Sequence, residues 1–208
     1  FKVKCTGKME LYGQTFHCWK EKGHGWVSLK NAMKQSCDTY FYEVARLLGV
    51  DRLNITAEKF GLGKKVLGDY FDNEKKGLFP NTKWKKNNLG KGWVLGETLI
   101  TGIGQGYTQT TPLQLCMMTA QIANGGFAVK PKIIVDNNPI SYEDAKQSME
   151  SGLLFDTKTE KLLDKKLFKN QKNIKIVQEA MFASTNERFG TSYKSRIDDP
   201  TYQFAGKT

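Results

Sequence analysis

Three cysteines and a histidine lie within the first 37 residues, and their spacing constrains how that part of the chain can fold. They follow the pattern Cys5-x12-Cys18-x5-His24-x12-Cys37. Three thiolates and an imidazole can complete a tetrahedral zinc site, although this spacing matches no short zinc-finger motif. In an exported protein, Cys5 and Cys18 could instead pair as a disulfide. His17 is a competing ligand, but adjacent residues rarely both reach one ion. We expect residues 1–27 to form an irregular excursion that a zinc site or a disulfide holds together.

The composition indicates a packed protein. Hydrophobic residues make up 39% of the 208 residues and aromatic residues 12%, which excludes wholesale disorder. No apolar run approaches the ~18 residues of a membrane span, and no signal peptide follows Phe1, so we expect an internal piece of a longer protein. The net charge of +11 fits an anionic neighbour, but the lysines gather in two loop-like stretches without an arginine-rich helix. We therefore predict no nucleic-acid partner.

Hydrophobic spacing predicts two helices that a short polar segment separates. The first begins after Ser28, which fits an N-cap, and the pattern breaks at Ser36-Cys37-Asp38. The second resumes at Tyr40 and stops at Gly49, a residue typical of helix ends. Asp51 is predicted to cap a further short helix.

The rest of the chain contains one strongly marked helix start. Thr111, Pro112 and Gln114 give a capping box with proline at the first helical position. The apolar pattern of this helix predicts that Cys116 is a small core residue. Residues 64–96 are rich in Gly, Lys and Asn, which predicts a long loop. Other patterns predict a strand over 129–135, a polar surface insertion over 136–172, a helix around 174–181 and a strand over 202–208.

Two short motifs point to chemistry. Ser36-Cys37-Asp38 interrupts a helical region, and Ala205-Gly206-Lys207-Thr208 lies in the last expected strand. Serine acyltransferases that recognise penicillin carry Ser-x-x-Lys, then Ser-x-Asn or Ser-x-Asp, then Lys-Thr-Gly on a strand. Taken alone, Ser36 and Asp38 are more often helix caps than catalysts, and Lys207 is more often a solvated lysine. The order of the motifs and their helix and strand contexts favour the catalytic interpretation.

The segment between the motifs carries a family resemblance. Residues 102–114, GIGQGYTQTTPLQ, resemble the GQG…TPLQ stretch of the monofunctional, class B penicillin-binding transpeptidases. The same GxGxG does not open a helix directly after a strand, so a nucleotide site is not predicted. Residues 18–42, with CWKEKGHG, SCD and TYFYEVA, look like the penicillin-binding protein 2 group, the transpeptidases of the cell-elongation machinery. The resemblance covers nearly the whole chain apart from 136–172.

This resemblance implies an α+β fold, with residues 1–208 as part of a transpeptidase domain: its helical part and the first strands of an antiparallel sheet. It implies peptidoglycan cross-linking by acyl transfer from D-Ala-D-Ala stem peptides through a serine acyl-enzyme, blocked by β-lactams. Ser36 would relay a proton to the leaving nitrogen, and Asp38 would orient a catalytic lysine or the substrate amide. Lys207 would place positive charge near Ser36 and the substrate carboxylate, and the Thr208 hydroxyl would bind that carboxylate.

The sequence departs from the family pattern in one serious respect. It contains no Ser-x-x-Lys, the motif that carries the acylated serine, and no glycine follows Thr208. Asp38 in place of Asn occurs in this branch of the family. We therefore expect that the part bearing the nucleophile and the end of the sheet lie outside this chain, and that the chain alone is inactive.

The resemblance also gives the cysteines a context, because the penicillin-binding protein 2 group carries a metal-binding constellation in this region. It implies a structural zinc ion on Cys5, Cys18, His24 and Cys37 and no cofactor for the acyl transfer itself. It further implies a single N-terminal anchor outside this chain, a domain on the outer face of the cytoplasmic (inner) membrane, and a membrane-embedded glycosyltransferase partner. Two alternatives stay open: a serine β-lactamase or sensor domain, and a catalytically silent, zinc-stapled binding module.

Overall fold

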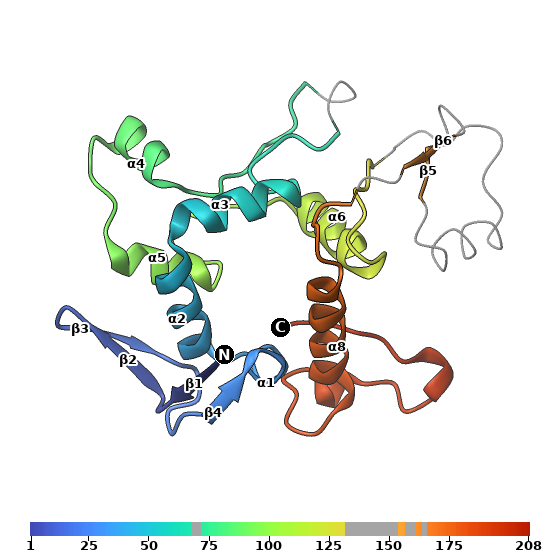
Figure 1. Cartoon of the computed structure of the whole chain (residues 1–208), viewed down its shortest axis with the longest axis horizontal. Coiled ribbons are helices and arrows are strands. Elements are labelled where there is room, and N and C mark those ends of the chain that lie inside the picture. The colour runs from blue at the N-terminus through green and yellow to red at the C-terminus, as the bar shows by residue number, and fades with distance from the viewer. Residues whose placement is uncertain (68–71, 132–153, 157–160, 164–165) are drawn as a thin grey trace. The chain divides into compact units, whose positions relative to one another are not determined.

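The computed structural model describes residues 1–67, 72–131, 154–156, 161–163 and 166–208 (Figure 1). The chain divides into two compact units. Unit 1 comprises Phe1–Ile55, Pro80–Thr108 and Lys175–Thr208, and unit 2 comprises Thr56–Phe79 and Gln109–Ile174. Helices dominate the described residues, and every strand pair among them is antiparallel, so the predicted α+β class is confirmed.

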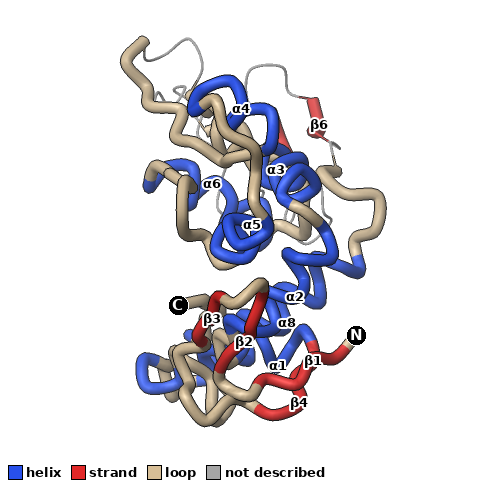
Figure 2. Tube along the Cα trace, turned by 90° about the vertical axis from the view of Figure 1, so that its left-hand side faces the viewer, coloured by secondary structure: helices blue, strands red, loops and turns tan. Residues whose placement is uncertain are grey.

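Two antiparallel strand pairs form the N-terminal part of unit 1, seen as red segments in Figure 2. They are β1 (Lys2–Cys5) with β4 (Gly25–Ser28), and β2 (Lys8–Leu11) with β3 (Gln14–His17). Tyr12 and Gly13 close the second pair with positive φ angles of 48° and 76°, as a two-residue hairpin turn of type I′ requires. The prediction of an irregular excursion over residues 1–27 is therefore wrong. Each strand has only four residues, too few for its alternation to stand out among the lysines and glycines.

Helices α1 (Leu29–Lys34) and α2 (Asp38–Leu48) confirm the two predicted helices and their interruption. Ser28 is the N-cap of α1, but its side chain makes no capping hydrogen bond. Gly49 ends α2 with a φ of 78°. Helix α5 (Leu95–Gly102) packs against α2, and the lack of a side chain at Gly102 permits this, because a Cβ there would collide with the Cβ of Ala45.

The region predicted as a long loop, 64–96, contains α4 (Thr82–Leu89) and the start of α5, so that prediction is wrong. The apolar stripe expected of a helix is missing from α4, because its buried residue is Lys85, whose ammonium lies 2.5 Å and 2.7 Å from the carboxylate oxygens of Glu97. Asp51 also departs from its predicted role. It lies inside the first turn of α3 (Val50–Lys59), and its carboxylate accepts a hydrogen bond of 2.9 Å from the backbone N–H of Thr82.

The core of unit 1 lies between the strand pairs and the first two helices. The buried residues there are Cys5, Cys18, Val27, Ala32, Cys37 and Tyr40, with Val3, Leu29, Phe41 and Val44 packed around them. Three of the four cysteines thus belong to the hydrophobic core, where burial of apolar side chains contributes most to stability.

In unit 2, helix α6 (Pro112–Ala123) begins with the predicted capping box. The Thr111 hydroxyl accepts from the Gln114 backbone N–H at 3.2 Å, and the Gln114 side chain accepts from the Thr111 N–H at 2.9 Å. Gln114 is fully buried, and its amide nitrogen also donates to two carbonyls of the preceding loop. Cys116, however, is exposed, so its assignment to the core is wrong.

Among the described residues 129–131 no strand forms, and the rest of the strand predicted over 129–135 lies outside the described residues. Most of the predicted insertion, 136–172, also lies outside them. Within it the structure describes two short strands, β5 (Leu154–Asp156) and β6 (Lys161–Leu163), which pair with each other. The helix predicted around 174–181 is confirmed as α8 (Lys172–Asn186).

The C-terminal segment of unit 1 is not the strand predicted over 202–208. Two short 3-10 helices, Tyr193–Ser195 and Pro200–Tyr202, precede residues 203–208, which have no strand partner among the described residues. A strand needs a neighbouring ladder for its backbone groups. Here the backbone instead bonds to α8, because Gly206 N–H donates to the Met181 carbonyl at 3.2 Å and Asn186 donates to the Phe204 carbonyl at 2.8 Å.

Across the described stretches, each helix is too short or too polar to cross a membrane.

Candidate active site and metal centre

Ser36 lies at the break between α1 and α2, in an unusual backbone conformation. Its φ is +51°, in the left-handed region that residues with a side chain rarely adopt. The N–H of Cys37 donates to the carbonyl of Ala32 at 2.9 Å, which closes the turn and holds Ser36 in this conformation. The caps of the two helices are Gln35 and Cys37, so Ser36 is not a cap and its hydroxyl is available for other contacts.

The C-terminal segment brings Lys207 and Thr208 to Ser36, across 171 positions of sequence. The Lys207 ammonium donates to Ser36 Oγ at 2.8 Å and also to the Thr208 carbonyl oxygen. Ser36 Oγ in turn lies 3.3 Å from that carbonyl oxygen, to which it donates. Three of the four residues predicted to be catalytic or to bind substrate therefore meet at one point.

Asp38, the fourth predicted residue, lies beside this group but faces another partner. It is the first residue of α2, and its carboxylate accepts a 2.9 Å hydrogen bond from the backbone N–H of Trp19. Burial raises the pKa of Asp38, and the Trp19 N–H opposes this rise. Surrounding residues that displace water lower the pKa of Lys207, whereas the charge of Asp38 raises it. Asp38 thus acts on Lys207 through its electric field, without a direct hydrogen bond in the structure.

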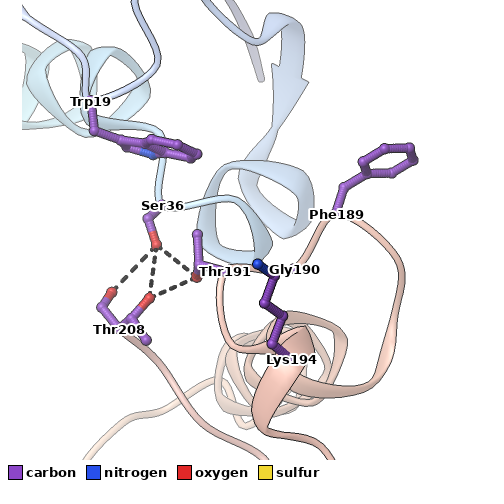
Figure 3. Close-up of a pocket in the computed structure, with 7 residues that line it drawn as sticks. All are labelled: Trp19, Ser36, Phe189, Gly190, Thr191, Lys194 and Thr208. Carbon is purple, nitrogen blue, oxygen red and sulfur yellow. Dashed lines mark hydrogen bonds between the residues drawn. The ribbon is translucent and has the colours of Figure 1, made fainter.

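A pocket of about 470 Å³ opens beside Ser36 (Figure 3). Its lining residues come from the segment after β3, the Ser36 turn, the segment after α8 and the C-terminal segment: Trp19, Ser36, Phe189, Gly190, Thr191, Lys194 and Thr208. Figure 3 shows the side chains of Ser36, Thr191 and Thr208 converging on one point, where their oxygens lie within hydrogen-bond range. Sequence reasoning missed Thr191, because the Gly-Thr-Ser after α8 carries no spacing that indicates a site.

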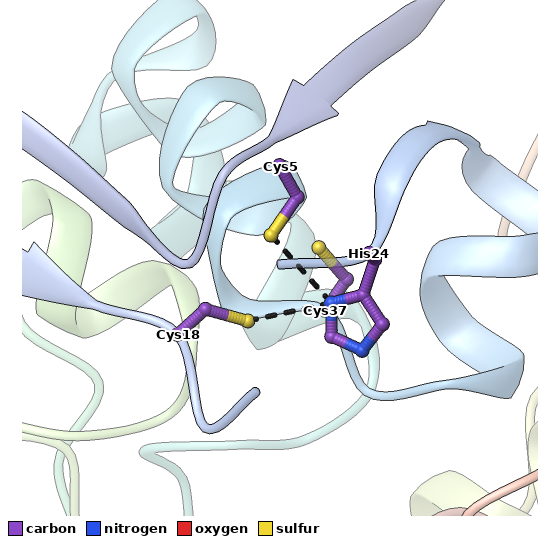
Figure 4. Close-up of side chains that lie close together, drawn as sticks. All are labelled: Cys5, Cys18, His24 and Cys37. Atoms are coloured by element: carbon purple, nitrogen blue, oxygen red, sulfur yellow. Dashed lines mark hydrogen bonds between the residues drawn. The ribbon is translucent and has the colours of Figure 1, made fainter. Parts of the chain in front are cut away.

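The cysteine–histidine cluster, Cys5, Cys18, His24 and Cys37, comes together as predicted (Figure 4). Its candidate ligand atoms all lie within 4.8 Å of one another. His24 Nδ1 is 3.5 Å from both Cys5 Sγ and Cys18 Sγ. The cysteines are free thiols, so the alternative disulfide between Cys5 and Cys18 is not formed. His17 is an exposed residue of β3, outside the cluster, and its backbone carbonyl accepts from the Tyr42 hydroxyl.

The donor set of this cluster fits a tetrahedral metal ion. Hydrogen bonding with Cys37 lowers the pKa of Cys18, while the same contact, together with burial, raises the pKa of Cys37. The lowered pKa of Cys18 favours its thiolate, which is the form that binds a metal, and a bound cation would replace the proton that Cys37 holds. His24 Nε2 is buried without a hydrogen-bond partner among the described residues, and Nδ1 is the nitrogen that faces the sulfurs. These three sulfurs and one nitrogen are ligands that zinc accepts in structural sites.

The cluster is joined directly to the Ser36 turn. Cys37 follows Ser36, and Trp19 follows Cys18. The Trp19 indole N–H donates to the Gln35 carbonyl at 3.0 Å, while its backbone N–H bonds to Asp38. The segment that carries Cys18 therefore holds the turn on both sides of Ser36.

A serine at a helix break, a lysine that donates to it and an adjacent threonine are the arrangement of a serine acyltransferase that recognises penicillin. The model of the penicillin binding protein transpeptidase domain matches residues 1–208, and the chain belongs to this family. Peptidoglycan D,D-transpeptidase MrdA of Acinetobacter baumannii is 41% identical over 134 residues, which are 64% of this chain and 20% of that protein.

Solved structures agree with this assignment. The chain is similar to Pseudomonas aeruginosa penicillin-binding protein 2 in complex with WCK 5153, with a TM-score of 0.76 and 35% identity over 93% of this chain and 41% of that one. It is also similar to Helicobacter pylori penicillin-binding protein 2 in complex with MreC, with a TM-score of 0.78 and 27% identity over 96% of this chain and 33% of that one. The resemblance to penicillin-binding protein 2 is thus confirmed, and the chain spans about a fifth of the length of the curated relative.

Proposed function

We propose that this chain forms part of the active site of a peptidoglycan D,D-transpeptidase. The observation that carries the proposal is the 2.8 Å hydrogen bond from Lys207 to Ser36, residues that the sequence pattern marks as the second and third catalytic motifs. The matching family and the 41% identity to a D,D-transpeptidase support it. The nucleophile would belong to the longer protein of which this chain is a segment.

The proposed reaction is a two-step acyl transfer. The serine of an upstream Ser-x-x-Lys attacks the D-Ala-D-Ala amide, forms an ester and expels the terminal D-Ala as an amine. Ser36 relays the proton that this nitrogen needs, because its hydroxyl both accepts from Lys207 and donates to a carbonyl oxygen. An amine of a neighbouring strand then attacks the ester, which releases the serine and forms the cross-link.

Lys207, Thr208 and Asp38 have binding and electrostatic roles in this proposal. The Lys207 ammonium stabilises the negative charge of the substrate carboxylate, and the Thr208 hydroxyl lies in the same pocket to bind it. Asp38 stabilises the charged form of Lys207, since its carboxylate raises the pKa of that amine. A β-lactam would enter the same pocket as a mimic of the acyl donor.

We further propose that the cysteine–histidine cluster holds zinc with a structural role. Four protein ligands leave no open coordination position for substrate. When bound, a zinc ion would link the segments that carry Cys5, Cys18, His24 and Cys37, and these ligands would fix the backbone that carries Ser36. The acyl transfer itself requires no cofactor.

The similarity to penicillin-binding protein 2 supports a proposal for the cellular role. We propose that the longer protein cross-links peptidoglycan during cell elongation and maintains rod shape. It would be held by a single N-terminal anchor, outside this chain, with this domain on the outer face of the cytoplasmic membrane. The Helicobacter pylori relative was solved with MreC, which supports an assembly with a protein of that kind, and a similar structure comes from a peptidoglycan synthase complex that coordinates polymerization and crosslinking, which supports a membrane-embedded glycosyltransferase as a partner.

One alternative function has an observation in its favour. The sequence contains no Ser-x-x-Lys, as expected of a catalytically silent module with a zinc-stapled penicillin-binding fold. What lies upstream distinguishes the two: an active enzyme requires Ser-x-x-Lys within about sixty residues of Phe1, whereas a silent module has none.

Labelling with a fluorescent penicillin tests the proposal. The full-length protein should form a covalent band that survives denaturation and that unlabelled penicillin prevents, because the β-lactam acylates the upstream serine. This 208-residue chain, checked for folding by its melting curve, is the control and should give no band. No band on the folded full-length protein would contradict the proposal and favour the silent module.

A further inference from the structure

The Thr191 hydroxyl lies among three other hydroxyl groups at the pocket, those of Ser36, Ser184 and Thr208. It lies 3.0 Å from Ser36 Oγ and 3.3 Å from Ser184 Oγ, and it accepts from the Thr208 hydroxyl at 2.7 Å. Figure 3 shows Thr191 beside Ser36 and Thr208, with its oxygen facing both. We call Thr191, Ser184 and Thr208 the hydroxyl network.

The backbone around Thr191 is anchored on two sides. Its N–H donates to the Lys34 carbonyl at 3.1 Å, which ties it to the end of α1 just before the Ser36 turn. Gly190 approaches the Ser184 carbonyl so closely that a Cβ would collide with it. The neighbouring Glu187 carboxylate is paired with Lys34 at 2.7 Å. Thr191 is therefore fixed relative to both α8 and the helix that leads to Ser36.

The Thr191 hydroxyl can donate one hydrogen bond to Ser36 while it accepts one from Thr208. A threonine hydroxyl has one proton to donate and two lone pairs to accept with. Because Thr191 accepts from Thr208, its own proton is free to go to Ser36. Ser36 Oγ then accepts from both Lys207 and Thr191, and its own proton is directed to the Thr208 carbonyl. With both lone pairs occupied, the orientation of the Ser36 hydroxyl is set.

We propose that Thr191 is a positioning residue for acyl transfer: its hydroxyl orients Ser36 and holds it in register with Lys207 and Thr208. This inference rests on the proposed transpeptidase function. Thr191 does not touch the reacting atoms and acts only through Ser36 and Thr208. Since a small misplacement of a catalytic group costs up to about a hundredfold in rate, removal of this single hydroxyl should slow acylation by about tenfold or more.

The test compares Thr191→Val with Thr191→Ser in the full-length protein. Valine keeps the shape of threonine without the hydroxyl, whereas serine keeps the hydroxyl. Thr15→Val, at an exposed position of β3, is the matched control. The rate constant for penicillin acylation is measured together with the melting temperature, and the crystal structure of Thr191→Val reports the position of Ser36.

We expect Thr191→Val to be acylated about tenfold or more slowly than the parent protein, at an unchanged melting temperature. The acylation rate of Thr191→Ser should remain within about threefold of the parental rate. Thr15→Val should be acylated at the parental rate. Equal rates for valine and threonine, or an equal loss for valine and serine, would overturn the role of the hydroxyl. If the parent protein is not acylated at all, the proposed function fails, and the crystal structure decides this inference alone. Ser36 Oγ in its parental position in Thr191→Val would overturn it, and a displaced Ser36 would support it.

Discussion

The two walls that flank Ser36 are built from different chemistry. On one side, the cysteine–histidine cluster lies in the hydrophobic core, with Cys5 1% exposed and Cys37 fully buried. On the other side, the hydroxyl network borders an open pocket and makes neutral hydrogen bonds of 2.7–3.3 Å. A metal ion bound to thiolates stabilises a fold by many kcal/mol, whereas each neutral hydrogen bond contributes about 1 kcal/mol.

This difference assigns the walls different tasks. The cluster sets where the Ser36 turn lies, since Cys37 and Trp19 both fix the backbone beside it. The hydroxyl network sets how the Ser36 side chain is oriented, and its weaker bonds can be exchanged for bonds to a ligand. Changes to the cluster should therefore affect folding, and changes to the network should affect reactivity first.

The largest effect is expected from breaking the cluster. Cys18→Ser should remove bound zinc and lower stability by about 4 kcal/mol, or roughly 10 °C in melting temperature, because the buried ligands lose their common partner. Metal content by mass spectrometry of the digested protein and thermal melting check this. Cys116→Ser, at the exposed cysteine, is the control and should leave both unchanged.

Zinc content near one per chain in Cys18→Ser, or a melting temperature equal to that of Cys116→Ser, would show that the cluster is only a group of core thiols. The cluster would then not hold its side of Ser36 more strongly than the hydroxyl network holds the other side.

An intermediate effect is expected where the hydroxyl network approaches α8. Gly190→Ala places a Cβ against the Ser184 carbonyl, so the turn that carries Thr191 must shift, at a cost of about 2 kcal/mol. Gly92→Ala is the matched control, because a Cβ there meets nothing within 4 Å. Urea unfolding of both variants measures the difference. Equal stabilities would mean that the turn yields without strain and that the network is not held by α8.

The smallest effect is expected at the ion pair between α1 and Glu187, the residue that follows α8. Hydrogen bonds from Lys34, and then Lys30, lower the pKa of Glu187 below its ordinary value of 4.5. A carboxyl whose pKa is lower in the folded state stabilises the fold above pH 4.5 and loses this contribution as the pH falls through the folded value. Because Glu187 is 42% exposed, solvent screening limits the contribution to about 1 kcal/mol or less.

Glu187→Gln should therefore be slightly less stable than the parent at pH 7, and this gap should close below pH 4.5. Glu179→Gln, at an exposed position of α8, is the control. Denaturant unfolding at pH 7 and pH 3 checks the result. A gap that widens as the pH falls would contradict the assigned sign.

The sequence predicted the cluster and the meeting of Ser36 with Lys207 and Thr208, because both depend on residue types in a fixed order. It predicted α2 and α6 because their caps are local signals. It did not predict α4, whose buried residue is a lysine satisfied by Glu97, nor the unpaired path of residues 203–208. Thr191 was missed for a similar reason: its contacts come from residues 155 and 17 positions away in sequence. Long-range partners of this kind leave no periodicity in the chain.

The measurement that tests the central claim most directly is the penicillin acylation rate of Lys207→Ala in the full-length protein. If Lys207 acts on Ser36 as the 2.8 Å contact indicates, acylation should fall by about a hundredfold to a thousandfold at an unchanged melting temperature. Lys83→Ala, on α4, should acylate at the parental rate. A Lys207→Ala protein that acylates within about twofold of the parent would contradict the account, since the contact that joins the two motifs would then have no part in the chemistry.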